Sequence, residues 1–281
     1  MMNFSTETVL LAFALTLFAG LSTGIGSLIA LLAKRTNTRF LSVVLGFSAG
    51  VMIYVSMIEI FAESNRLLTE ALGDPNGTWV TVAGFFGGIL IIALIDRFVP
   101  AADNPHEMRK VESMSCGKME LHEVRECPHH RGRLMRLGVF TALAIGIHNF
   151  PEGIATFIAG LKDPSLGITI AIAIAIHNIP EGIAVSVPIF YATGSHRKAF
   201  RWSLLSGLSE PLGALVGYLI LMPFMTDVMF GVIFASVAGI MVFISLDEIL
   251  PTARAYGEPH LSIYGMVGGM AVMAISLLLF M

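Results

Sequence analysis

The chain has 281 residues, of which 55% are hydrophobic and only 13% are charged, and its formal net charge is −3. Soluble domains carry about 25% charged residues, so the composition excludes an ordinary soluble domain and indicates a protein that crosses a membrane several times. The small net charge gives no sign of a polyanionic partner, and we expect no nucleic acid to bind.

Eight runs are long and apolar enough to cross a bilayer as helices, which takes about 20 residues each. In chain order they cover about residues 9–33, 40–62, 79–99, 138–160, 166–191, 199–224, 228–250 and 261–280. The runs are continuous, whereas membrane strands are about 10 residues long and alternate in polarity. We therefore expect an all-α polytopic membrane protein with eight transmembrane helices, formed as a single transmembrane domain over residues 1–281.

The basic residues predict the orientation of these helices. Fifteen of the seventeen Lys and Arg residues lie at odd-numbered connections between the runs, and only Arg66 and Lys162 lie at even-numbered ones. Because basic loops stay in the cytoplasm, this bias places both termini outside the cytoplasm, in a multi-pass protein of the cell (inner) membrane.

Two smaller features of the runs each have two interpretations. Glu59 lies four residues before Glu63 near the end of the second run, where it either faces a water-filled entrance or extends to the membrane interface. Glycines four residues apart recur in five runs, either as close-packing faces or by chance among 28 glycines. These pairs are 20/24, 46/50, 84/88, 213/217 and 265/269.

The third connection, residues 100–137, is the only long one. It contains four of the eight histidines and both cysteines, namely His106, His122, His129, His130, Cys116 and Cys127. We expect a flexible cytoplasmic loop. Its histidines either bind transition metals weakly or belong to a solvated linker, since no fixed zinc-site spacing is present.

One polar motif occurs twice, as HNFPEGIA at residues 148–155 and HNIPEGIA at 177–184, and seven of its eight positions are identical. Each copy lies near the middle of an apolar run, the fourth and the fifth. Ionisable groups at that depth are costly and usually line a functional site. Because a short loop joins the two helices, they run antiparallel, and the copies meet as the inverted pair from which many transporters build a central site.

The spacing within each copy places the polar side chains on one face of a helix. His148 and Glu152 are separated by four residues and Asn149 and Glu152 by three, and the same holds for His177, Asn178 and Glu181. The proline before each Glu frees a backbone carbonyl and kinks the helix. The glycine after each Glu allows a neighbouring helix or an ion to approach closely.

These residue types are ligands for divalent metals. Imidazole with carboxylate suits zinc, iron(II), manganese or nickel, and amide oxygens suit harder ions. The two His and two Glu could complete one site. With Asn149, Asn178 and Glu210, which precedes Pro211 in the sixth run, a second ion could share the two glutamates. A plainer alternative is a buried His–Glu pair that locks two helices together.

A further acidic pair, Asp247 and Glu248, lies near the end of the seventh run. It could supply exit-side ligands or mark a solvated helix end, and we favour the second interpretation.

The paired HNxPEG motifs, the Ser-Glu-Pro motif of the sixth run and the eight spans resemble the ZIP family of divalent metal transporters. The resemblance is strongest to the bacterial ZupT-like branch, in which the fifth-helix motif also begins with His. It covers nearly the whole chain. It implies import of zinc and related ions such as iron and manganese, with cadmium and cobalt as further candidates, by movement of one helix bundle against another. No catalytic cofactor is implied. The partners would be the ions and the bilayer, with a second copy in a homodimer as a further candidate.

Carried over by motif position, the resemblance implies a binuclear site between the fourth, fifth and sixth helices. His148, Glu152, His177 and Glu181 would form the first metal site. Asn149, Asn178 and Glu210 would form the second, with Glu152 and Glu181 bridging. The family also places a residue of the second helix near the site, and candidates lie within residues 52–59.

An intramembrane zinc metalloenzyme is the alternative from another class. It would need an open coordination position and a general base, as in His-Glu-x-x-His, and that motif is absent. We therefore expect a transporter and not an enzyme. A channel without alternating access is a third possibility that the sequence leaves open.

Overall fold

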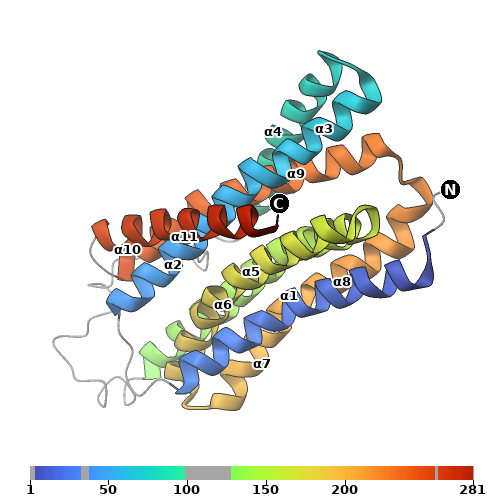
Figure 1. The fold of residues 1–281 in the computed structure, drawn as a ribbon. Coiled ribbons are helices and arrows are strands. Elements are labelled where there is room, and N and C mark those ends of the chain that lie inside the picture. The colour runs from blue at the N-terminus through green and yellow to red at the C-terminus, as the bar shows by residue number, and fades with distance from the viewer. Residues whose placement is uncertain (1–3, 33–37, 99–127, 257–258, 281) are drawn as a thin grey trace.

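A computed structural model describes residues 4–32, 38–98, 128–256 and 259–280 (Figure 1). These described residues are helical apart from short connections and contain no strand. The predicted all-α class is confirmed.

Within the described residues, each of the eight predicted runs is helical. Some runs form one long helix, and others form a series of consecutive helical segments. The segments are α1 (Thr6–Leu32), α2 (Thr38–Val55), η1 (Ser56–Ile60), α3 (Phe61–Leu72), α4 (Asn76–Phe98), α5 (Pro128–Lys162), α6 (Pro164–Thr193), α7 (His196–Gly207), α8 (Ser209–Val216), η3 (Gly217–Leu221), η4 (Met222–Phe224), α9 (Asp227–Ile244), η5 (Ser245–Ile249), α10 (Leu250–Tyr256) and α11 (Pro259–Phe280). The segments η1, η3 and η5 are single π-helical turns.

Seven helices within the described residues are long and apolar enough to cross a membrane. Helix α5 is not among them. A polytopic membrane protein is therefore supported, and eight spans remain a prediction. Helix α5 begins at Pro128, inside the segment expected to be a loop, and residues 100–127 of that segment lie outside the described residues.

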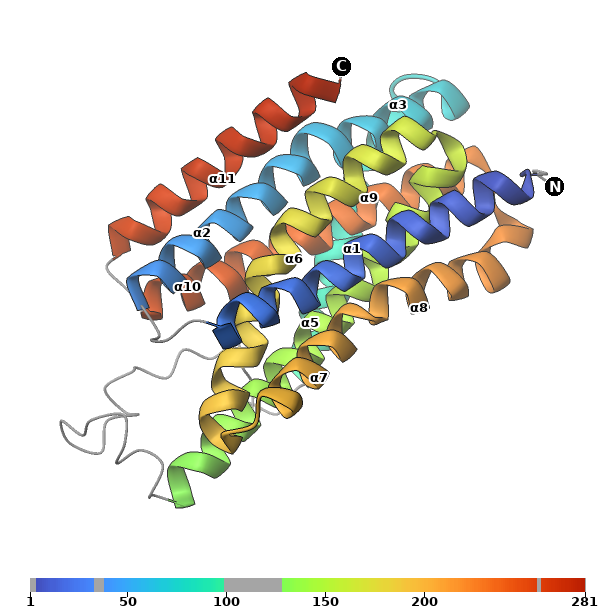
Figure 2. The ribbon, with the colours of Figure 1, turned by 60° about the horizontal axis from the view of Figure 1, so that its bottom comes forward.

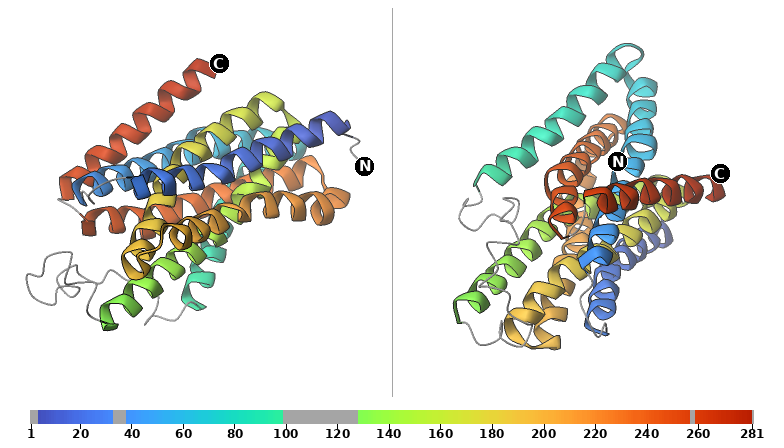
Figure 3. Two further views of the ribbon diagram at one scale, coloured as in Figure 1. Left: turned by 90° about the horizontal axis from the view of Figure 1, so that it is seen from below. Right: turned by 90° about the vertical axis from the view of Figure 1, so that its left-hand side faces the viewer.

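The helices form two bundles. Helices α1, α5, α6, α7 and α8 pack on one another, and α2, α3, α4, α9, α10 and α11 form the second group (Figures 1 and 3). The bundles meet where α6 packs against α2 and where α5 packs against α9. Figure 2 shows α6 lying between α1 of its own bundle and α2 of the other.

The turn between α5 and α6 is closed by a helix cap. Asp163 accepts hydrogen bonds from the backbone N–H of Ser165 at 2.8 Å and from its hydroxyl at 2.9 Å. These bonds favour the carboxylate and lower the pKa of Asp163. The short, capped turn makes α5 and α6 an antiparallel pair, as the sequence predicts.

Several of the paired glycines are sites of close backbone approach. A Cβ added at Gly46 or Gly50 of α2 would overlap carbonyl oxygens of α11, and one added at Gly265 or Gly269 of α11 would overlap carbonyl oxygens of α2. Gly88 has the same relation to α9. The packing interpretation is confirmed for these pairs, whose glycines serve contacts within the chain.

Candidate metal centre

The two copies of the motif meet inside the α5–α6 pair, and their His and Glu side chains pair crosswise. His148 Nε2 of α5 lies 3.4 Å from Glu181 Oε2 of α6, and His177 Nε2 of α6 lies 3.4 Å from Glu152 Oε2 of α5. All four side chains are at most 2% exposed. Each histidine therefore faces the carboxylate of the other copy, which is the arrangement expected of an inverted pair.

These pairs leave much of their hydrogen-bonding capacity unused. Glu152 Oε1, Glu181 Oε1 and the Nδ1 atoms of both histidines are buried without a hydrogen-bond partner among the described residues. Burial of a polar atom without a partner is unfavourable by a few kcal/mol, and most buried polar atoms in proteins are satisfied. The plainer alternative of a helix-locking pair leaves Oε1 of both glutamates without a partner, whereas a bound cation would satisfy these carboxylate oxygens.

The two asparagines are held by their amide nitrogens. Asn178 donates from Nδ2 to the carbonyl of Ala19 in α1 at 2.9 Å and to Oε1 of Glu210, while Asn149 donates from Nδ2 to the carbonyl of Ser206 in α7 at 3.4 Å. The Oδ1 atoms of both side chains are buried and have no partner in the described part of the chain. Both amides therefore keep an oxygen free to accept, as a ligand must.

Glu210 is brought to the centre by the bend between α7 and α8. Leu208 separates the two helices, and Glu210 lies in the first turn of α8, fully buried and bonded to Asn178. Its second oxygen, Oε2, is buried without a partner among the described residues.

Six of the seven predicted site residues are thus joined in three pairs, and Asn149 is bonded to the neighbouring helix α7. Within the described ranges, no three His, Cys, Asp or Glu side chains are grouped so as to hold one ion as they stand. The binuclear site therefore stays a prediction.

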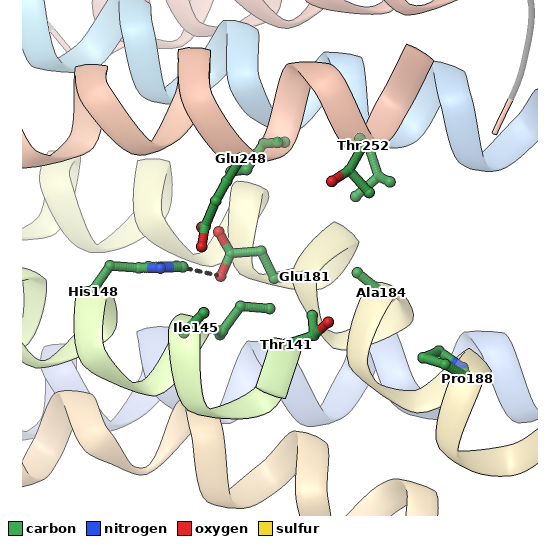
Figure 4. Close-up of a pocket in the computed structure, with 11 residues that line it drawn as sticks. Thr141, Ile145, His148, Glu181, Ala184, Pro188, Glu248 and Thr252 are labelled. Atoms are coloured by element: carbon green, nitrogen blue, oxygen red, sulfur yellow. Dashed lines mark ion pairs between the residues drawn. The ribbon is translucent and has the colours of Figure 1, made fainter. Parts of the chain in front are cut away.

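A carboxylate outside the seven predicted site residues lies beside the first pair. Glu248 lines a cavity of about 80 Å³ together with His148, Glu181, Thr141 and Thr252, and its carboxyl group points toward Glu181 and His148 (Figure 4). The favoured interpretation of a solvated helix end is wrong for this residue. The π-turn η5 continues directly into α10, and Glu248 is half-buried while the preceding Asp247 is exposed.

The second helix also contacts the motif, through Ser48, while a site residue within the range 52–59 stays a prediction. Ser48 of α2 is fully buried and donates a hydrogen bond to the carbonyl oxygen of His177 at 3.2 Å. Its position in an ordinary apolar run gives no sequence signal for this contact.

The glycine that follows each motif glutamate serves helix packing, as predicted. A Cβ added at Gly153 would overlap the carbonyl oxygen of Glu210, and one added at Gly182 would overlap that of Thr23. These contacts bring α8 and α1 against the motif.

We expect Gly153→Val and Gly182→Val to destabilise the protein by about 1–3 kcal/mol or more, because overpacking forces the backbones apart. The measurement is the thermal unfolding midpoint of the purified protein in detergent. Gly87→Val in α4 is the matched control, because nothing lies within 4 Å of a Cβ added there. Equal midpoints for all three variants would contradict the close packing.

A multi-pass helical protein with buried, paired His, Glu and Asn side chains has the architecture of a membrane transporter for metal ions. The chain matches the family model described as "ZIP Zinc transporter" over residues 7–277, and it belongs to the ZIP family. It is a transporter and not an enzyme.

Close relatives cover nearly the full chain. It is 68% identical over 271 residues to "Zinc transporter ZupT" of Lysinibacillus sphaericus, covering 96% of this chain and 98% of the relative. It is 65% identical over 273 residues to the protein of that name from Oceanobacillus iheyensis, covering 97% and 99%. The identity to the one from Nitratidesulfovibrio vulgaris is 63% over 273 residues, covering 97% and 98%.

Proposed function

We propose that the protein carries divalent transition-metal ions into the cytoplasm through a binuclear centre between α5, α6 and α8. Zinc is the first candidate, because the relatives are named zinc transporters. Iron(II) and manganese are also proposed, with cadmium and cobalt as further candidates, because imidazole and carboxylate ligands serve all of these ions. The observation that carries the proposal is the pair of crossed His–Glu contacts with buried, unpartnered oxygen and nitrogen atoms around them.

In this proposal the first ion is bound by His148, His177, Glu152 and Glu181. The second is bound by Asn149, Asn178 and Glu210 and shares the two motif glutamates. Small shifts of buried side chains would bring the three pairs around the ions. The free Oδ1 atoms of the asparagines and Oε2 of Glu210 support the second set.

The proposed direction of transport follows from charge and from the cavity beside Glu248. The cavity adjoins the half of α5 that precedes His148, and this half follows the basic third connection. Under the charge bias, that end faces the cytoplasm. We therefore assign the cavity to the exit path, in a cell-membrane protein with eight spans and both termini outside the cytoplasm.

Zinc uptake and metal content of the reconstituted protein test this proposal together. We expect saturable uptake of radiolabelled zinc into liposomes, competition by iron(II) and manganese, and about two ions bound per chain. Saturation also distinguishes a carrier from a simple channel. Binding of a single ion, or zinc uptake that an excess of iron(II) and manganese leaves unchanged, would contradict the binuclear site and the proposed range of metals.

A further inference from the structure

A second internal repeat relates α2 to α9 at a separation of 189 residues. Residues 49–61 read AGVMIYVSMIEIF and residues 238–250 read AGIMVFISLDEIL, with six identical positions and only one that is not conservative. The repeat includes Glu59 in the first copy and Glu248 in the second. It therefore connects the cavity-lining Glu248 with a carboxylate whose role the transport site does not explain.

The repeat is present in the structure as well as in the sequence. Helices α2 and α9 both have 18 residues, and each is followed by a π-turn of five residues, η1 or η5, that contains the glutamate. Ser56 Oγ donates to the carbonyl of Met52 at 2.6 Å, and Ser245 Oγ donates to that of Met241 at 2.7 Å. Single π-turns inside helices often mark functional sites.

Burial follows the same repeat. Twelve of the thirteen paired positions fall in the same class of buried, half-buried or exposed side chains, and both glutamates are half-buried. Helices α2 and α9 run antiparallel, because α10 packs on α2 while α3 packs on α9. Glu59 and Glu248 therefore lie toward opposite ends of the molecule.

The repeat of the HNxPEG motif has the same inverted relation. In the two repeats, α5 corresponds to α6 and α2 corresponds to α9. The group His148, Glu181 and Glu248 therefore corresponds to the group His177, Glu152 and Glu59. The first group lines the cavity. In the second group, His177 and Glu152 already form the equivalent crossed pair at the same distance of 3.4 Å.

The two halves differ in how tightly they are packed. The cavity is lined by Thr141, Ala144 and Ile145 of α5 and by Leu45 of α2. At the same offsets of 29 and 189 residues, just before the repeated segments, the equivalent positions are at most 1% exposed: Ile170, Ala173, Ile174 and Phe234. One half of the framework thus contains a cavity beside its His and Glu residues. The equivalent positions of the other half, which we call the closed half, are fully buried.

We propose that Glu59 is a cation-binding residue of the entrance path, which contacts the divalent ion when the closed half opens. Its carboxylate then lies beside His177 and Glu152 as that of Glu248 lies beside His148 and Glu181 here. The match with Glu248 in sequence, π-turn and burial favours this role over a carboxylate that merely extends to the membrane interface. The inference rests on the proposed metal centre, because it assigns Glu59 the step before the ion reaches that centre.

The test is zinc uptake by cells that express the protein, measured against the external zinc concentration. Glu59→Gln removes the charge and keeps the volume, so we expect the half-saturating zinc concentration to rise about fivefold with the maximal rate within about twofold, which corresponds to about 1 kcal/mol of lost attraction. Glu59→Asp should restore most of the affinity. The matched control is Glu70→Gln in α3, an exposed residue, for which we expect wild-type uptake.

Chemical modification provides a second readout that does not require Glu59→Gln to fold well. In a Cys116→Ser, Cys127→Ser background, Glu59→Cys should react with a membrane-impermeant thiol reagent, and zinc should slow this reaction several-fold. Identical uptake by Glu59→Gln and Glu70→Gln, or a reaction rate that zinc does not change, overturns the assignment. If Glu152→Gln stops uptake while Glu59→Gln has no effect, only the role of Glu59 fails. If Glu152→Gln also transports normally, the metal centre itself is wrong.

Discussion

Replacing Glu152 or Glu181 by Gln is expected to reduce zinc uptake about a hundredfold, since even supporting residues of metal sites contribute about 10–100-fold. The substitution preserves the volume and the ability to hydrogen-bond, but it removes a negative charge that would balance the divalent ion. Each carboxylate also faces the histidine of the other copy at 3.4 Å. The loss at either position therefore affects ligands from both helices.

The measurement is the initial rate of radiolabelled zinc uptake at equal amounts of protein in the membrane. Expression level and thermal unfolding midpoint should stay near those of the wild type, because both side chains keep their shape. Glu70→Gln on the exposed face of α3 again serves as the control. Normal uptake by both motif variants would exclude the crossed pairs as the transport site.

Replacing His177 by Asp is expected to change metal preference about tenfold in favour of manganese over zinc, because the site stays charged but becomes richer in oxygen. His177 is fully buried and faces Glu152, so the new carboxylate would join an existing one. The measurement is uptake of zinc and manganese in competition. Equal losses for the two metals would indicate that the imidazole serves packing or gating and does not set selectivity.

Glu210→Ala, by contrast, should lower the number of ions bound from two toward one while zinc at the first site is retained. Glu210 contacts Asn178 and belongs to neither crossed pair. Asn178 keeps its bond to the carbonyl of Ala19 in this variant. Metal content of the purified protein decides the matter, and a variant that still binds two ions would remove Glu210 from the second site.

The sequence predicted the helices and the motif well, for a physical reason. Long apolar runs have few alternatives in a membrane, and a doubled motif at fixed spacing places its polar groups on one face of each helix. The structure adds that the pairs cross, so that His148 meets Glu181 and not Glu152. This pairing depends on the rotation of α5 against α6, which the pattern within either helix does not contain.

Residues outside the motif were harder to place. Glu248 looked like part of a solvated helix end, because hydropathy falls at Asp247 and Glu248 and a proline follows. The π-turn η5 changes the helical register there and brings only the second of the two carboxylates to the cavity. A one-residue change in register is not visible in composition or periodicity. Ser48 was missed for a similar reason, since a buried serine in an apolar helix gives no sign of its partner.

The glycine contacts between helices have a mechanical consequence. In the described ranges, every glycine whose added Cβ would overlap a carbonyl oxygen of another helix contacts a helix of its own bundle. If two helices slid along one of these glycine contacts, their backbones would have to move apart. Interiors packed this tightly deform little, so such sliding is unfavourable. The junction between the bundles has no such interlocking backbone contacts among the described residues. Each bundle is therefore expected to move as a rigid body. Displacement during a transport cycle would be concentrated at the interface between the bundles, where α6 and α5 face α2 and α9.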